Sequence, residues 1–237
     1  MAIPISVIIP TLNEERTIAA TLAHTASLGF AELIVVDGGS TDETLALLES
    51  YRLKTRSSAL SPVHWVTASP GRARQMNEGA KASHGEVLLF LHADTQLPRD
   101  ANTVINRALA DRRTVGGRFD VRFDRPSMWG IIISRMMNWR SRLSGLATGD
   151  QALFVRRPIF EQMGGFADMP LMEDIEFSRR LKRKGATAAL TATVTTSFRR
   201  WEQQGPLRTI LLMWTLRFLY WIGISPSHLV KWYNAVR

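Results

Sequence analysis

The chain has 237 residues, with 30 lysines and arginines against 21 aspartates and glutamates, and a formal net charge of +9 at pH 7. This length suffices for one large α/β domain with a buried core, or for such a domain with a small appendage. The absence of cysteine excludes a disulfide framework and a thiolate metal site, and it suits a reducing compartment. The positive charge favours acidic partners, which include phosphates, anionic lipids and nucleic acids.

The first half of the chain alternates between strand and helix patterns. Strands are predicted at residues 5–9, 33–37 and 63–66, and a fourth strand ends at Asp94. The predicted helices end near Ser27, begin at Ser40 or Thr41, and cover residues 72–83. This repeated βαβ spacing predicts a mixed, mainly parallel sheet flanked by helices, an α/β fold. Because residues 1–10 run into the first strand without a preceding basic segment, we expect no secretory signal and a cytoplasmic protein.

The second half is less regular. An alternating stretch at residues 115–123 predicts a half-solvated strand, and a short strand is expected at 152–155. Helices are predicted at 127–143, from Pro158 to Gly164-Gly165, and at 173–184. The helix at 127–143 carries one apolar face, made of Trp129, Ile132, Ile133, Met136 and Leu143.

Residues 207–224 are almost entirely apolar, which raises the question of a transmembrane span. The segment is short for a bilayer core about 30 Å thick, and Arg217 near its middle is costly there. The first interpretation is a helix packed on the domain or a partner, the second an interfacial membrane helix, and the third a span. Ser225 and Pro226 then predict a last helix. We therefore expect a main domain, 1–200, and a C-terminal helical appendage, 201–237.

Acidic residues stand at three positions that suit a ligand site. Asp37 and Asp94 end predicted strands, and open α/β sheets bind ligands at the carboxyl ends of their strands. The pair Glu173-Asp174 begins a later helix. A carboxylate at a strand end is also a metal ligand, so Asp94 is the first metal candidate.

The sequence resembles the inverting family 2 glycosyltransferases with the GT-A (Rossmann-like) fold. The matching motifs, in family order, are residues 6–14, residues 35–42, Asn77-Glu78-Gly79 with Gly85-Glu86, His92-Ala93-Asp94, Gly164-Gly165-Phe166 and Glu173-Asp174. Each motif alone is weak, whereas the ordered set, which covers about residues 3–185, is specific. The chain also resembles a small bacterial subgroup associated with arsenosugar biosynthesis, through His92-Ala93-Asp94-Thr95 and Gly149-Asp150-Gln151-Ala152.

The resemblance implies transfer of a single sugar from a nucleoside-diphosphate sugar, with a UDP-sugar favoured, to an acceptor hydroxyl. In the family, an Asp-x-Asp motif holds the ribose and a divalent metal, so Asp94 is the implied ligand of Mn²⁺ or Mg²⁺. This cation would act as a Lewis acid on the leaving diphosphate. His92 replaces the first acidic residue of the motif, and its imidazole can bind the ribose, help to hold Mn²⁺, or simply cap the strand.

The nucleotide-sugar site implied by the resemblance is formed by residues that follow the first strands. They are Pro10, Thr11, Asn13, Glu14, Asp37, Arg72, Arg74, His92 and Ala93. Asp37 is placed to accept a ring N–H of the base, and its alternative role is an N-cap. Arg72 and Arg74 either reach the base or diphosphate or remain solvated surface charges. Glu14 either contacts the nucleotide or favours the helix start.

The acid pair of the family corresponds to Glu173 and Asp174, with Asp174 as the implied general base. A carboxylate near the acceptor hydroxyl removes its proton as the oxygen attacks the anomeric carbon opposite the diphosphate, which inverts the configuration. Glu173 would orient the acceptor or pair with an arginine. The alternative is that both are ordinary acids at a helix N-terminus.

The acceptor-binding candidates lie in two further segments. Asp150 and Gln151 open a short apolar strand, where Asp150 can also be a turn residue. Arg199-Arg200-Trp201 is similar to the Gln-x-x-Arg-Trp motif of processive relatives, although Ser197 stands in place of Gln. Processive synthesis also needs several transmembrane helices, so single-sugar transfer is favoured, with Arg200 and Trp201 gripping the diphosphate or acceptor.

Other function classes stay open at this point. A sugar nucleotidyltransferase would share the topology, but the sequence shows no glycine-rich, lysine-bearing phosphate loop near the first strand. A catalytically inactive nucleotide-binding module would tolerate loss of Asp94 or Asp174, and both are present. The basic residues are dispersed, so we expect no nucleic-acid partner. The apolar segments 127–143 and 207–224 suit peripheral contact with the inner face of a membrane, or cover an acceptor.

Overall fold

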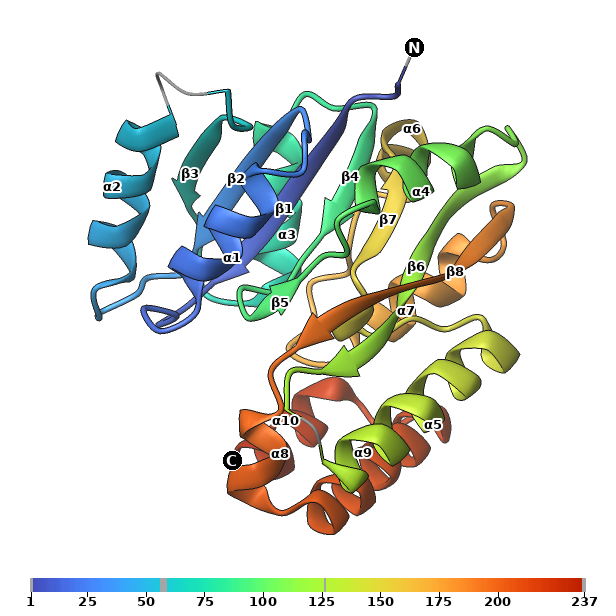
Figure 1. Cartoon of the computed structure of the whole chain (residues 1–237). Coiled ribbons are helices and arrows are strands. Elements are labelled where there is room, and N and C mark those ends of the chain that lie inside the picture. The colour runs from blue at the N-terminus through green and yellow to red at the C-terminus, as the bar shows by residue number, and fades with distance from the viewer. Residues whose placement is uncertain (1, 56–58, 126, 236–237) are drawn as a thin grey trace.

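A computed structural model describes residues 2–55, 59–125 and 127–235, and within them eight strands form one sheet. The strand order is β3-β2-β1-β4-β7-β6-β8-β5 (Figure 1). Pairing is parallel from β3 to β4 and between β6 and β8, and antiparallel at β7 and β5. The mixed, mainly parallel sheet expected from the sequence is confirmed.

The first half of the chain forms the parallel part of the sheet. Its strands are β1 (Ile5–Thr11), β2 (Glu32–Asp37), β3 (Val63–Thr67) and β4 (Val87–Phe90). Its helices are α1 (Ile18–Ala26), α2 (Thr44–Thr55) and α3 (Arg72–Ala82). Alternate residues of β1 enter two different cores: Val7 packs with residues of α1 and α2, and Ile8 packs with residues of α3. The buried strands therefore read as continuous apolar runs, as parallel strands covered on both faces do.

Strand β4 ends at Phe90, four residues before the expected end at Asp94. Phe90 lies opposite Ile8 in the parallel ladder, and the N–H of Leu91 still donates to the carbonyl of Ile8. The next bond of the ladder would need an N–H from Pro10, which proline lacks. His92, Ala93 and Asp94 therefore leave the sheet as a turn beside the end of β1.

The second half adds the mixed part of the sheet and its helices. The strands are β5 (Thr95–Gln96), β6 (Thr114–Phe123), β7 (Leu153–Arg156) and β8 (Ala186–Thr196). The helices are α4 (Ala101–Leu109), α5 (Met128–Ser144), the 3-10 turn η1 (Gly149–Gln151), α6 (Arg157–Gln162) and α7 (Glu173–Leu181). Of these elements, β5, β8 and α4 were not predicted from the sequence.

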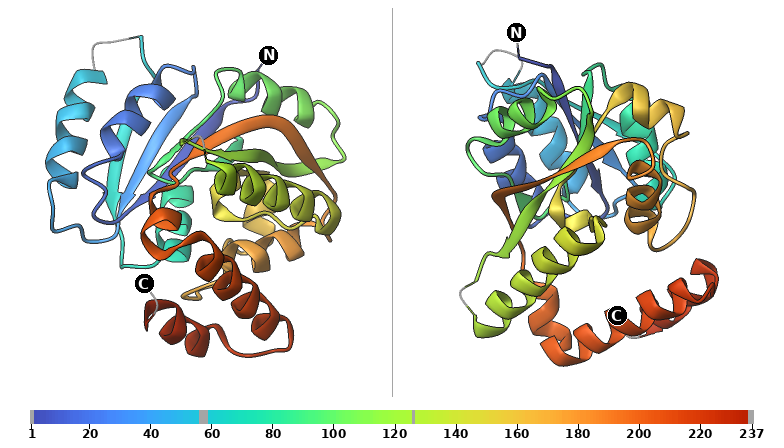
Figure 2. Two further views of the ribbon diagram at one scale, coloured as in Figure 1. Left: turned by 60° about the horizontal axis from the view of Figure 1, so that its bottom comes forward. Right: turned by 90° about the vertical axis from the view of Figure 1, so that its right-hand side faces the viewer.

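The C-terminal segment forms three helices, α8 (Arg199–Gln204), α9 (Pro206–Trp221) and α10 (Pro226–Ala235). Helices α9 and α10 pack on the start of α7 through Leu216, Leu229 and Tyr233, which contact Met172 and Ile175. Figure 2 shows α5 and these three helices gathered at the end of the molecule opposite the N-terminus. No helix among the described residues is long and apolar enough to cross a membrane. The division into a domain and an appendage stays a prediction.

Candidate functional site

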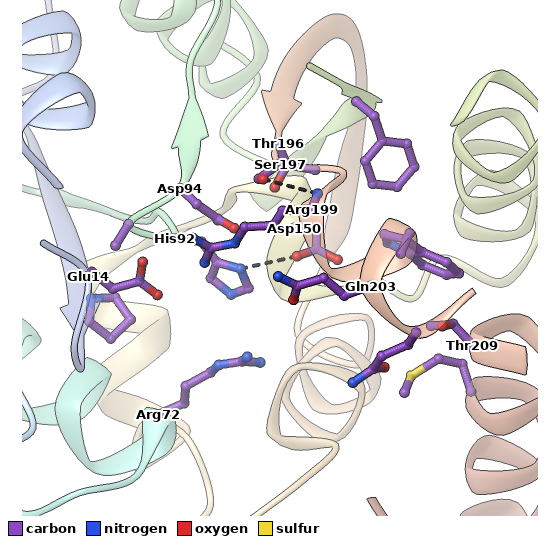
Figure 3. Close-up of a pocket in the computed structure, with 16 residues that line it drawn as sticks. Glu14, Arg72, His92, Asp94, Asp150, Thr196, Ser197, Arg199, Gln203 and Thr209 are labelled. Carbon is purple, nitrogen blue, oxygen red and sulfur yellow. Dashed lines mark hydrogen bonds and ion pairs between the residues drawn. The ribbon is translucent and has the colours of Figure 1, made fainter. Parts of the chain in front are cut away.

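A cavity of about 360 Å³ opens where β1, β4 and β8 end, between these strand ends and helices α8 and α9 (Figure 3). Many of the residues predicted for the site line it: Pro10, Glu14, Arg72, His92, Ala93, Asp94, Asp150 and Trp201. They come from positions far apart in the sequence, and the carboxyl ends of the strands bring them together. The cavity therefore lies at the edge of the sheet at which the sequence placed the site.

His92 and Asp150 are joined across this cavity. Nδ1 of His92 lies 3.1 Å from Oδ1 of Asp150. The neighbouring Gly149 allows this approach, because a Cβ atom at that position would overlap the imidazole of His92. The turn η1 thus holds the imidazole that follows β4 in a fixed place.

The acid pair begins α7 directly after Met172, whose backbone is left-handed with φ 69°. Oδ2 of Asp174 accepts the main-chain N–H of Gly149 at 2.8 Å, and Oδ1 accepts the N–H of Ile175 at 2.7 Å. Asp174 lines a small pocket that shares His92 and Pro10 with the main cavity. Its partly exposed carboxylate is therefore fixed by main-chain donors beside the site.

Glu173 has a different environment from its neighbour. Its side chain is buried, with a residue exposure of 4%, and Oε1 lies 3.6 Å from Nη1 of Arg72. Burial raises the pKa of Glu173, and the negative charge of Asp174 adds to this rise while Arg72 opposes it. Both acids line the small pocket beside the main cavity, and Asp174 is the more exposed of the two.

Asp94 is half-buried and lines the cavity with Glu14 and His92. Within residues 2–55, 59–125 and 127–235, no three His, Cys, Asp or Glu side chains are placed to hold a metal ion by themselves. Hard cations such as Mg²⁺ are often held by one or two carboxylates together with substrate phosphates and water. The residues present fit that kind of metal, which would arrive with a diphosphate.

Several predicted residues serve the loops around the cavity. The carboxylate of Asp37 is buried and accepts the N–H groups of Gly39 at 2.8 Å and Ser40 at 3.0 Å. Asn13, with φ 56°, accepts the N–H of Thr41 at 2.8 Å and so ties the loop after β1 to the loop after β2. Helix α2 begins at Thr44, later than the expected start at Ser40 or Thr41, so these contacts of Asp37 hold the loop after β2 and do not cap a helix. The contact of Asp37 with a base stays a prediction.

Other predicted residues lie outside the main cavity. Thr11 lines an adjoining cavity of about 250 Å³ together with Glu14 and Arg72. Arg74 forms an ion pair with Asp168 at 2.9 Å and lines a separate cavity. Gln151 is buried and caps its own turn through Thr148. The side chain of Arg200 lies outside the described residues.

Residues 6–164 match the protein-family model described as Glycosyl transferase family 2. The chain belongs to this family. It is 35% identical over 99 residues to poly(ribitol-phosphate) beta-N-acetylglucosaminyltransferase TarS of Staphylococcus aureus, a match covering 40% of this chain and 17% of TarS. It is 30% identical over 169 residues to undecaprenyl-phosphate 4-deoxy-4-formamido-L-arabinose transferase of Pseudomonas paraeruginosa, covering 67% of this chain and 49% of that protein. The chain thus spans less than half of the length of these two relatives.

Solved structures of other glycosyltransferases have a similar fold. The crystal structure of S. aureus TarS 1-349 in complex with UDP-GlcNAc superposes with a TM-score of 0.64 at 20% identity, covering 82% of this chain and 58% of that one. Mannosyltransferase PcManGT from Pyrobaculum calidifontis in complex with GDP-Man and Mn2+ gives 0.63 at 19% identity, covering 96% and 67%. This likeness confirms the fold class expected from the sequence.

Part of the cavity wall in this family 2 chain was not predicted. The unpredicted residues are Phe123, Thr196, Ser197, Arg199, Gln203, Gln204, Thr209 and Met213. Phe123 ends β6, and the others come from the end of β8, the residue after it, and helices α8 and α9, which all follow the last family motif. In the sequence, the Arg199-Arg200-Trp201 motif pointed to this segment. In the structure, Arg199 and Trp201 of this motif line the cavity.

Proposed function

We propose that this chain transfers a single sugar from a nucleoside-diphosphate sugar to an acceptor hydroxyl, with inversion at the anomeric carbon. One observation supports this proposal above the others. In this member of family 2, Asp94 and the His92–Asp150 pair line the main cavity, and Asp174 lines the small pocket that shares His92 with it. TarS with UDP-GlcNAc and PcManGT with GDP-Man and Mn2+ support a nucleotide-sugar donor. A UDP-sugar is the favoured donor.

Asp174 acts as the general base in this proposal. The acceptor hydroxyl donates its proton to the carboxylate while its oxygen bonds to the anomeric carbon. The bond from that carbon to the diphosphate breaks at the same time, and the nucleoside diphosphate leaves with the electron pair. The main-chain N–H groups of Gly149 and Ile175 keep the carboxylate oriented before the acceptor binds.

Negative charge develops on the leaving diphosphate, and the donor side of the cavity carries the groups that would meet it. Asp94 would hold a divalent cation, Mn²⁺ or Mg²⁺, which would stabilise that charge as a Lewis acid. Arg72 and Arg199 line the same cavity and bring positive charge to it. His92 is held by Asp150 where it can donate a hydrogen bond to the ribose.

Calorimetric binding of UDP, GDP, dTDP and CDP, with and without Mn²⁺, tests the donor site in wild type and Asp94→Ala. We expect one nucleotide to bind with Mn²⁺ and to lose at least tenfold in affinity in the variant. Transfer assays with sugar conjugates of that nucleotide then test the reaction. Binding without any transfer or donor hydrolysis would favour an inactive nucleotide-binding module, and pyrophosphate-dependent donor formation would favour a nucleotidyltransferase. The arsenosugar-associated subgroup and the cytoplasmic location stay predictions.

We further propose that an anionic membrane surface contacts the end of the molecule formed by α5 and α9 (Figure 2). Each helix presents large apolar side chains to solvent at helical spacing. On α5 they are Met128, Trp129, Ile131, Ile132, Met136, Trp139 and Leu143, and on α9 they are Leu207, Leu211, Trp214, Phe218 and Trp221, followed directly by Ile222. Trp139 is 68% exposed and Trp214 59%. Tryptophan prefers the headgroup level of bilayers, and large exposed apolar patches mark interaction sites.

The positive charge of this end supports an anionic membrane as the partner. Arg135 and Arg208 are exposed on these same helices, and the chain carries a net charge of +9. Apolar anchors combined with basic residues bind anionic lipid, and each basic residue near the surface contributes about 1 kcal/mol. The undecaprenyl-phosphate transferase among the relatives, named for a lipid phosphate, supports work at a membrane.

Co-sedimentation with vesicles tests this contact. We expect binding to vesicles that contain phosphatidylglycerol, weaker binding to phosphatidylcholine alone, and loss of binding in Trp139→Ser with Trp214→Ser. Leu53→Ser is the matched control, because Leu53 is 55% exposed on α2, away from this end. Equal sedimentation with and without vesicles, or a partner protein that covers these tryptophans, would contradict the proposal.

A further inference from the structure

Two arginines near Asp174 lack the partners that arginines elsewhere in the structure have. Nε and Nη2 of Arg140, on α5, are buried without a hydrogen-bond partner among the described residues. Its Nη1 makes only a 3.5 Å bond to the carbonyl of Leu146. By contrast, Arg142 on the same helix pairs with Asp120 at 2.7 Å. A buried guanidinium that leaves two nitrogens unbonded indicates a missing acceptor.

Arg217, on α9, is the second of these arginines. It follows Met213 by one helical turn, and Met213 lines the main cavity. Its side chain forms no hydrogen bond or ion pair with any residue in the described part of the chain. Arg217 therefore lies on the same side of α9 as Met213, the side that faces the site.

Packing brings the two arginines to the start of α7. Leu216, which precedes Arg217, lies in one apolar cluster with Ile175, which follows Asp174, and Leu146, whose carbonyl accepts from Arg140, packs against the same cluster.

Burial and the positive charge of Arg217 together lower the pKa of Arg140 to about 10, while the negative charge of Asp174 opposes this change. Burial also lowers the pKa of Arg217, against the charges of Asp174 and Asp150. Both side chains remain positively charged at neutral pH. Of these acids, Asp174 already accepts two main-chain N–H groups and Asp150 is paired with His92, and neither forms a hydrogen bond with the two unpartnered nitrogens of Arg140.

We infer that Arg140 and Arg217 together bind a phosphate group carried by the acceptor. Guanidinium groups match phosphate oxygens with paired N–H donors, and two of them balance the charge of a phosphate monoester. The position beside Asp174 assigns the phosphate to the acceptor, because the general base must contact the acceptor hydroxyl. This assignment rests on the proposed function for the role of Asp174.

The donor diphosphate does not account for these arginines. The groups that suit it, Asp94, Arg72 and Arg199, line the main cavity, whereas neither Arg140 nor Arg217 is among its lining residues. The structure thus separates a donor side with Asp94 from an acceptor side with the arginine pair.

Binding of inorganic phosphate, measured by calorimetry and by the shift in melting temperature, tests the subsite without turnover. The measurement is made with the donor site saturated by the nucleoside diphosphate and Mn²⁺. We expect phosphate to bind wild type under these conditions and to bind the Arg140→Gln, Arg217→Gln double variant at least tenfold more weakly. Arg107→Gln is the matched control, because Arg107 is exposed on α4, outside the two helices that carry the pair.

Each result bears on the inference separately from the proposed function. Phosphate binding that is unchanged in the double variant, or abolished by the nucleotide, would overturn the subsite even if sugar transfer is shown. Loss of binding in the double variant would support the subsite even if no transfer is found. Should that variant fail to fold, Arg217→Lys keeps the charge and is expected to weaken phosphate binding by a smaller factor than Arg217→Gln.

The source of the phosphate is distinguished by competition. Glycerol 3-phosphate represents a soluble acceptor, and a short-chain phosphatidic acid represents a lipid acceptor at the membrane-facing end. Displacement of phosphate by either compound supports the subsite, and the one that binds more tightly names the source. Displacement by neither, at concentrations that saturate the site with phosphate, would overturn the assignment to an acceptor.

Discussion

The main-chain N–H of Gly149 donates a 2.8 Å hydrogen bond to Oδ2 of Asp174. The next residue, Asp150, pairs with the imidazole of His92 at 3.1 Å. One short turn therefore fixes both the proposed base and the imidazole that follows β4. The position of the base relative to the donor site is set by main-chain geometry as well as by side chains.

Replacing Asp174 with Asn should lower kcat by about 10²- to 10⁴-fold, because the amide cannot take the proton of the acceptor hydroxyl. Nucleoside-diphosphate affinity should stay within a factor of about three, because the donor side is built from other residues. Steady-state kinetics and calorimetry measure the two effects. Asp168→Asn is the control, since Asp168 is exposed and pairs with Arg74 outside the main cavity. Full activity in Asp174→Asn would exclude its role as the base.

Gly149→Ala should impair the site more than its size suggests. The added Cβ would overlap the imidazole of His92, so either the ring or the turn that holds Asp174 must move. We expect a loss of at least tenfold in kcat, and a loss of about 1–3 kcal/mol in the free energy of unfolding. Kinetics and chemical denaturation measure these changes.

Gly130→Ala provides the comparison for this substitution. Gly130 lies within α5, and a Cβ atom there would meet its nearest neighbours at 3.6 Å, an ordinary contact. Alanine is also the better helix former. Activity and stability should be kept in Gly130→Ala. Equal behaviour of the two variants would show that the turn tolerates displacement of His92.

The parallel half of the fold followed from local patterns, whereas the other half depended on contacts between distant segments. The apolar runs that became β1 and β2 are bounded by proline and glycine turns, so their type and position were readable. Strand β8 was missed because its alanines and threonines are mostly half-buried and give no strong apolar run. Its pairing with β6, across some seventy residues of sequence, decides its conformation.

The site, too, has residues that the sequence predicted and residues that it did not. His92, Asp94 and Asp174 belong to ordered motifs, so the sequence identified them before their positions in space were known. Arg140 could not be assigned to the site from the sequence, because which side of α5 meets the site depends on how α5 and α9 pack. The apolar face predicted on α5 is real, yet Trp129, Ile132, Met136 and Leu143 are exposed, while the core side carries Ile133 and Met137. Periodicity finds an apolar stripe but not what covers it.

The contact between His92 and Asp150 should appear as an interaction energy in a double-mutant cycle. Single replacements by alanine should each lower kcat/KM, and the double variant should lose less than the sum of the two. We expect a coupling of about 0.5–2 kcal/mol, since both groups line the cavity and neither is fully buried. Kinetics of the four proteins measure it. Additive losses would show that the two side chains act independently.

The buried Glu173 predicts how stability varies with pH. Its pKa in the folded chain is raised above 4.5 by burial and by Asp174, so above that value the unfolded chain loses a proton that the folded chain still holds. The contribution of Glu173 to stability therefore falls as the pH rises toward its folded pKa and levels off above it. In Glu173→Gln the side chain is neutral at every pH, so this pH-dependent contribution to the free energy of unfolding is absent.

The difference in unfolding free energy between Glu173→Gln and wild type should therefore increase from about pH 4 upward, by about 1.4 kcal/mol for each unit of pKa shift. Denaturation of both proteins at a series of pH values measures this difference. Glu161→Gln controls for the loss of one negative charge, because Glu161 is exposed on α6. A difference that decreases with pH would mean that the ion pair with Arg72 outweighs burial, and Glu173 would then be charged beside Asp174 during the reaction.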